Sequence, residues 1–99
     1  MVAHIVMWRI ASTNANSKEE NILLVQEHLA ALPAAITEIY EYEIGVNKVH
    51  SERAYDIVLI SRFKSWDDLK IYREHSEHVS VAGFIGSVVQ EAAVVDYEY

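Results

Sequence analysis

Segments with the two-residue period of β-strands alternate along the chain with segments of helical spacing. The strand pattern covers residues 3–10, 39–46, 55–63 and 92–97, and helical patterns begin after Ser17, Ser65 and Ser76. The predicted order is β-α-β-β-α-(α)-β. Its simplest closed form is an α+β, ferredoxin-like βαββαβ domain, with a four-stranded antiparallel sheet covered by helices on one face. We expect a single domain over residues 1–99.

The first strand predicts that both faces of the sheet are covered. His4, Val6 and Trp8 share one face, while Ile5 and Met7 lie on the other, so both faces are largely apolar. Hydrophobic residues make up 52% of the chain, which is high for a small monomer. We therefore expect a homodimer through the open face of the sheet.

Capping signals define the helices. Ser17 and Glu20 have the spacing of a capping box, and we expect this first helix to reach Leu32 and to be stopped by Pro33. Its expected inner stripe is Ile22, Val25, Leu29 and Leu32. Ser65 is expected to cap the second helix and Ser76 the third, whose predicted stripe is His78, Ala82, Ile85 and Val89.

Composition excludes several classes of function. The formal net charge is −7 and no Lys/Arg cluster occurs, so neither nucleic acid nor an anionic membrane surface is an expected partner. No apolar run is long enough to span a membrane, and the first ten residues alternate as a strand rather than forming a signal peptide. The chain has no Cys. A cytoplasmic location is the default expectation, and no cofactor is indicated.

Tyr72, His75 and His78 form the only cluster of acid–base side chains without an evident electrostatic role. A neutral His78 can remove a proton next to a carbonyl, and Tyr72 can donate to the enolate oxygen. On one continuous helix these two side chains would point roughly 120° apart, so they converge only if the chain bends near Ser76. In the alternative interpretation, Tyr72 is a packing residue and His78 bonds to nearby backbone.

Other polar residues leave alternatives open. His75 and His78 have a spacing that can hold a transition metal, but no third ligand is identifiable, and we predict no metal site. His4 either lines a pocket or is a hydrogen-bonded core residue. Glu41 and Glu43 share a face that is expected to be solvated or to lie at a dimer rim. His28 and His50 are expected on the surface.

The chain resembles the stress-responsive dimeric α/β barrel (Dabb) family at four places. These are His4–Trp8, Ala54–Leu59 with its Tyr-Asp pair, Tyr72–Val79 with its paired histidines, and Val94–Glu98. The four pieces occur in the family's order over nearly the whole chain. The resemblance implies a ferredoxin-like monomer, a dimer whose two sheets form a barrel, and a cavity between sheet and helices lined by His4, Val6, Trp8 and His75.

One branch of this family, the plant polyketide cyclases similar to olivetolic acid cyclase, uses a Tyr and a His in an aldol cyclisation. The resemblance implies that these roles fall on Tyr72 and His78. Ile57 stands where the cyclase has a second pocket histidine, and Ser76 stands where the family has a proline. Asp96 lies in the last piece and could help to hold a hard cation, although further oxygen ligands are not evident.

Two functions follow from the sequence. In the first, the protein is a small dimeric stress-associated protein without catalysis, with a pocket for a small apolar or aromatic ligand. In the second, it is a lyase or cyclase acting on an aromatic or polyketide-like substrate, with His78 as base and Tyr72 as acid. A cofactor-free monooxygenase is a weaker third option.

Overall fold

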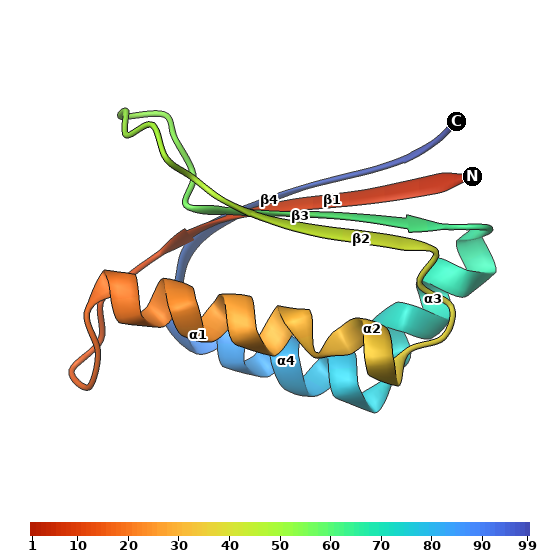
Figure 1. The fold of residues 1–99 in the computed structure, drawn as a ribbon, viewed down its shortest axis with the longest axis horizontal. Helices are drawn as coiled ribbons and strands as arrows, with labels where there is room; N and C mark the ends of the chain where they lie inside the picture. Colours follow the sequence, from red (N-terminus) through yellow and green to blue (C-terminus); the bar gives the residue numbers. More distant parts are fainter.

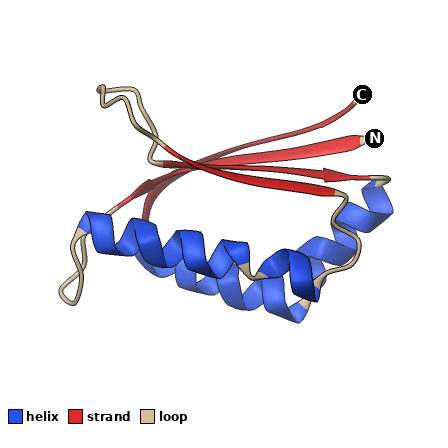
Figure 2. Cartoon of the chain, viewed as in Figure 1, coloured by secondary structure: helices blue, strands red, loops and turns tan.

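The computed structural model describes residues 1–99 and has two layers, a four-stranded antiparallel sheet and a layer of helices on one of its faces (Figure 1). The strands are β1 (Val2–Ile10), β2 (Glu41–Val46), β3 (Ile57–Phe63) and β4 (Val89–Glu98), in the spatial order β2-β3-β1-β4. The other face of the sheet carries no helix (Figure 2). The ferredoxin-like architecture predicted from the sequence is confirmed.

The central strands β1 and β3 show the predicted alternation. Val6 and Trp8 are buried towards the helices, whereas Met7 on the opposite face is 37% exposed. In β3 the odd-numbered residues are buried and the even-numbered ones are partly exposed. β1 pairs with both β3 and β4, and β3 pairs with both β1 and β2, so these two strands form the centre of the sheet.

The first helical segment is divided in two. The capping box is present, since Ser17 accepts from the Glu20 amide at 3.1 Å and Glu20 accepts from the Ser17 amide at 3.0 Å. However, α1 spans Lys18–Ala30, and a short helix α2 covers Leu32–Ala35. The prediction that Pro33 stops the helix is wrong, because Pro33 lies in the first turn of α2, where its missing N–H has no partner to lose.

Two helices lie between β3 and β4, as predicted. Ser65 caps α3 (Trp66–Glu74), as predicted, by accepting from the Asp68 amide. The cap of α4 (Ser76–Val88) is His75 rather than Ser76, because the Nδ1 atom of His75 accepts from the Glu77 amide at 3.1 Å. Since an imidazole nitrogen can replace a hydroxyl oxygen as acceptor, the cap moves one residue towards the N-terminus.

The strand limits also differ from the predicted ones. β2 and β3 begin two residues later than expected, at Glu41 and Ile57. β4 is longer, because its pairing with β1 runs from Val2–Glu98 to Ile10–Val89 with an irregularity at Arg9/Ile10.

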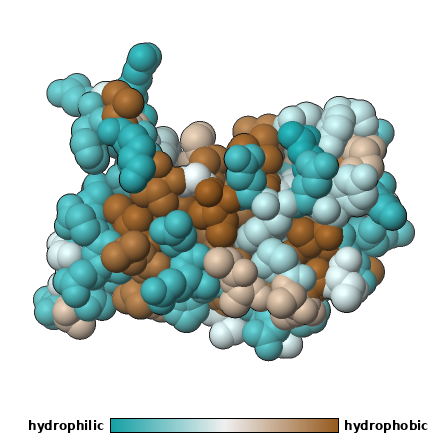
Figure 3. Space-filling model, in the orientation of Figure 1, coloured by the Kyte–Doolittle hydropathy of each residue, from teal (hydrophilic) through white to brown (hydrophobic).

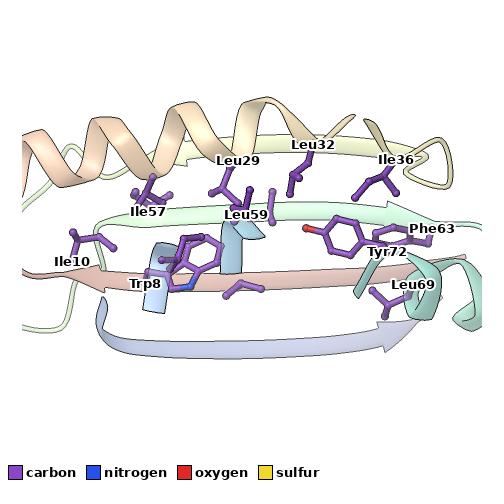
Figure 4. Packing of buried hydrophobic residues seen from close by; sticks show 14 of the residues in the cluster. Trp8, Ile10, Leu29, Leu32, Ile36, Ile57, Leu59, Phe63, Leu69 and Tyr72 are labelled. Carbon is purple, nitrogen blue, oxygen red and sulfur yellow. The ribbon is translucent and has the colours of Figure 1, made fainter. Parts of the chain in front are cut away.

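The core lies between the sheet and the helices (Figure 4). Buried side chains from every helix and from the central strands β1 and β3 meet there, among them Ile10, Val25, Leu32, Ile57, Phe63, Leu69, Tyr72 and Ile85. Asn21 is also buried within α1 and donates to the Ala11 carbonyl at 2.9 Å, whereas the predicted Ile22 packs against the core but is only partly buried. No helix is long and apolar enough to cross a membrane.

Replacing Leu69 by Ala tests this core. Leu69 is 1% exposed, whereas Leu23, also in the interior of a helix, is 59% exposed. We expect Leu69→Ala to lower the free energy of unfolding by about 2–5 kcal/mol, because it leaves a cavity. The matched variant Leu23→Ala should change it by less than about 0.5 kcal/mol. Urea unfolding followed by circular dichroism measures both, and equal effects would contradict the assigned layer arrangement.

Candidate functional site

A cavity of about 260 Å³ lies between the sheet and helix α4. Its walls are predominantly apolar, and three polar side chains, those of His4, Tyr72 and His78, are grouped at one end. The remaining lining residues are Val6, Trp8, Leu29, Leu59, Val81, Ala82, Ile85, Gly86, Val89 and Ala92. All four residues of the stripe predicted for the last helix line this cavity, although Val89 belongs to β4.

Small residues mark the mouth of the cavity. Ala82, Gly86 and Ala92 are exposed although they line it, and they lie on α4 and β4. Leu29 and Leu59, on α1 and β3, are buried. The cavity therefore opens between α4 and β4 and extends towards the centre of the sheet.

The break between α3 and α4 brings Tyr72 and His78 together. His75 is extended (φ −62°, ψ 135°), so the two helices do not share an axis. The ring centres of Tyr72 and His78 are 4.5 Å apart. The predicted bend near Ser76 is present, and it gives the convergence that a continuous helix would prevent.

The hydrogen bond of His78 determines which nitrogen serves as a base. Its Nδ1 atom lies 3.1 Å from the Arg73 carbonyl oxygen, which can only accept, so Nδ1 carries the proton of the neutral ring. The lone pair is then on Nε2. Burial lowers the pKa of His78, the charges of His4 and Arg73 act in the same direction, and the bond to the Arg73 carbonyl opposes them. A neutral imidazole at neutral pH is the form that a general base requires.

Tyr72 is suited to donate a proton in a hydrogen bond. It is 1% exposed, and burial raises its pKa to about 12 against a smaller opposing effect of its bond with Tyr42. Its ring packs on Phe63 at 5.1 Å between centres, and its hydroxyl points towards the middle of the sheet, near Leu59 (Figure 4). Tyr42 donates to the Leu29 carbonyl at 3.0 Å, and burial and the neighbouring Tyr72 raise its pKa as well.

His4 is held by a carboxylate that also binds Arg73. The Nδ1 atom of His4 bonds to one oxygen of Asp96, and the Arg73 guanidinium bonds to the other. Because the carboxylate accepts, Nδ1 is the protonated nitrogen of neutral His4, and Nε2 makes no hydrogen bond within the protein. The His4 ring meets the Tyr72 ring edge to face at 6.0 Å. Arg73 thus anchors both histidines, His78 through its carbonyl and His4 through Asp96.

The structure brings together most of the residues predicted for the site. His4, Val6, Trp8, Tyr72 and His78 line the cavity. His75, which was also predicted to line it, does not, because its ring caps α4. The structure contains no group of three or more His, Cys, Asp or Glu side chains placed to hold a metal ion.

The sequence did not predict the contacts that Asp96 and Arg73 make with the two histidines. His4 and Asp96 are directly opposite in the antiparallel pairing of β1 with β4. Alternation shows which face each residue occupies, but this contact also depends on the register between strands 92 residues apart.

Comparison with known proteins places the chain in a family. The family model described as Stress Responsive A/B Barrel Domain matches residues 2–99. A dimeric protein of unknown function with a ferredoxin-like fold from Bacteroides fragilis is 33% identical, with a TM-score of 0.80 over 99% of this chain and 95% of that one. No curated protein matches the sequence.

Two more distant structures share the fold. A dimeric ferredoxin-like protein of unknown function from Thermobifida fusca is 21% identical, with a TM-score of 0.84 over 99% of this chain and 90% of that one. The hydroxynitrile lyase from Passiflora edulis is 18% identical, with a TM-score of 0.81 over 97% of this chain and 90% of that one.

The lowered pKa of His78 predicts a pH dependence of stability. In the unfolded chain this histidine titrates near its ordinary value of 6.5, and in the folded protein it titrates lower. Between the two values the unfolded chain binds a proton that the folded protein does not, so the free energy of unfolding falls as the pH falls below 6.5. Urea titrations at several pH values should show a smaller fall for His78→Gln, whereas the exposed control His50→Gln should behave like the parent protein. An unchanged slope in His78→Gln would rule out a partly buried, neutral His78.

Proposed function

The chain belongs to the stress-responsive A/B barrel domain family, and we propose that it is a homodimer that binds a small apolar or aromatic molecule in the cavity between its sheet and its helices. The observation that carries this proposal is the shape and chemistry of the cavity. Its walls are apolar, it opens to the surface, and its polar groups are gathered at one end. This is the usual composition of a small-molecule site.

The size and polarity of the cavity narrow the class of ligand. Its volume of about 260 Å³ is at the lower limit for ligand sites, which favours a molecule of one or two rings. No Lys or Arg side chain lines it, so the protein offers no cationic side chain there to neutralise an anionic ligand. A neutral ligand would place its ring near Trp8 and an oxygen near Tyr72 and His78.

The open face of the sheet is the surface we propose for the dimer. Residues that alternate away from the helices are apolar along its centre, and they include Ile5, Met7, Val58, Ile60, Ala93 and Val95. Val95 is 58% exposed and Met7 is 37% exposed in the single chain. Pairing of two such faces would cover them. The relative from Bacteroides fragilis, at 33% identity, is described as dimeric.

A second candidate function is a lyase or cyclase reaction in the same cavity. The specific observation favouring it is that the free Nε2 of a neutral His78 lies beside the Tyr72 ring at an otherwise apolar site. Nε2 would remove a proton from carbon next to a carbonyl group, while the Tyr72 hydroxyl donates to the oxygen that becomes negative. The new carbanion would attack a second carbonyl carbon, and the imidazolium would return its proton to the oxygen formed. The hydroxynitrile lyase from Passiflora edulis shows that this fold can carry lyase chemistry.

Blocking the cavity tests the binding proposal. Gly86 lines the cavity and a Cβ there meets no atom within 4 Å, so Gly86→Leu should fill the space without disturbing the backbone. We expect it to weaken binding of small aromatic ketones such as acetophenone at least tenfold, about 1.4 kcal/mol, measured by ligand-observed NMR.

Gly83→Leu is the matched control, since Gly83 lies on the same helix with equal free space but outside the cavity. Its binding should stay within twofold of the parent protein. If none of a broad set of neutral aromatic probes binds the parent protein, or if both leucine variants bind as it does, the binding proposal fails.

Hydrogen exchange at carbon tests the chemical proposal separately. In D₂O, the parent protein should speed exchange of the acetophenone methyl protons, followed by NMR, because His78 removes them. The exchange requires that His78 takes a methyl proton, loses it to solvent and returns a deuteron to the carbon. We expect His78→Gln to lower the exchange rate by roughly 10²-fold or more and Tyr72→Phe by a similar factor. Binding of the same ketone should change less than about threefold. If the ketone binds but the protein does not speed its exchange, the binding function stands and the lyase or cyclase function is wrong.

A further inference from the structure

We propose that residues 47–56, named here the arm, contact the second copy of the chain in the homodimer. This inference rests on the open-face dimer proposed above and adds a surface that the sheet itself does not supply. The arm joins β2 to β3 and rises from the sheet on the side away from the helices (Figure 1). A second copy on the open face would therefore lie beside it.

The arm carries one exposed apolar side chain, Val49, among polar neighbours. Val49 is 77% exposed, more than the other exposed large hydrophobic residues of the chain. Figure 3 shows hydrophobic atoms near the tip of the arm among hydrophilic ones. An isolated exposed valine is ordinary, but this one is held on a projection towards a face that is itself apolar.

The root of the arm is braced, so the projection is a preformed feature. The Arg9 guanidinium lies 4.5 Å from the centre of the Tyr55 ring, donates to the Glu52 carbonyl at 3.1 Å and forms an ion pair with Glu91 at 3.2 Å. The Tyr55 hydroxyl also donates to Glu91 at 3.1 Å. These contacts join the arm to β1 and β4. A braced surface loses less conformational entropy on binding than a flexible loop.

The sheet surface continues from the root of the arm as a hollow. Met7, Tyr55 and Val58 line it, and Gly45 opens it, because a Cβ at that position would lie 3.0 Å from Cγ1 of Val58. The volume of the hollow is about 250 Å³, and most of its lining is hydrophobic. The root of the arm and the sheet therefore share one largely hydrophobic hollow that a side chain of the second copy can fill.

The arm carries two cations without ion-pair partners, and the open face carries a carboxylate without one. Lys48 and Arg53 are exposed and form no ion pair within the chain, in a protein whose net charge is −7. Glu43 alternates onto the open face, is exposed and also has no ion-pair partner in the chain. A second copy brings the cations of one arm towards carboxylates of this kind, which favours a copy of this chain as the partner.

Three Asp substitutions separate the proposals. Met7 lies on the open face and Val49 on the arm. Val79, which is 57% exposed on α4 in the helical layer, is the control. The dissociation constant of the dimer is measured by sedimentation equilibrium over a dilution series of the full chain. We expect Val49→Asp to raise it about tenfold, Met7→Asp to raise it more, and Val79→Asp to leave it unchanged. Equal melting temperatures under the conditions used show that the variants are folded.

The outcomes discriminate the arm from the face. If Met7→Asp dissociates the dimer and Val49→Asp does not weaken it, the arm proposal is wrong and the open-face dimer stands. If Met7→Asp stays dimeric, the open-face dimer is wrong, and the arm proposal fails with it. As a second test, Lys48→Gln combined with Arg53→Gln should also weaken the dimer and reduce its sensitivity to salt, because exposed ion pairs are screened and these two would be absent. An unchanged dimer in this double variant and in Val49→Asp would overturn the proposal.

Discussion

An extended residue between two helices determines where the polar end of the cavity forms. His75 turns the backbone after α3, and its own ring then caps α4 through the Glu77 amide. Without that turn, Tyr72 and His78 would lie on different sides of one helix. Because the backbone turns at His75, the two rings are 4.5 Å apart. The Arg73 carbonyl, which lies at the end of α3, can then accept from His78. The end of α3 thus determines both the geometry of the site and the tautomer of His78.

The Tyr55–Asp56 pair shows how a short motif can serve the fold rather than the site. Asp56 accepts from the Ile10 amide at 2.7 Å and pairs with Lys18 at 3.2 Å, so it joins the end of β1 to the start of α1. Tyr55 packs under Arg9 and reaches Glu91 on β4. Neither residue lines the main cavity. The motif therefore stabilises the connections at the end of the sheet from which the 47–56 segment rises.

Local patterns predicted the fold because each depends on neighbouring residues. The alternation in β1, the caps at Ser17 and Ser65 and the bend before His78 are properties of short stretches, and all three are present. Predictions failed where two local solutions compete, as at Pro33, which can end one helix or begin another, and at His75, whose ring nitrogen caps in place of Ser76. The bonding of His4 to Asp96 could not be predicted, because it requires the register of β4 on β1. Nor could the open state of the cavity, which depends on small residues such as Gly86 meeting no other side chain.

The alternation of β4 has a consequence for how the chain tolerates insertions and deletions. Ala92 lines the cavity and Asp96 holds His4, whereas Ala93 and Val95 face the opposite side of the sheet. Because successive strand residues point to opposite faces, adding or removing one residue within β4 would exchange the two sets for the rest of the strand. The carboxylate that orients His4 would turn to the open face, and a valine or tyrosine would turn towards the helices. Changes of length in this strand are therefore compatible with the architecture only in steps of two, whereas the loops that join the other elements carry no such parity.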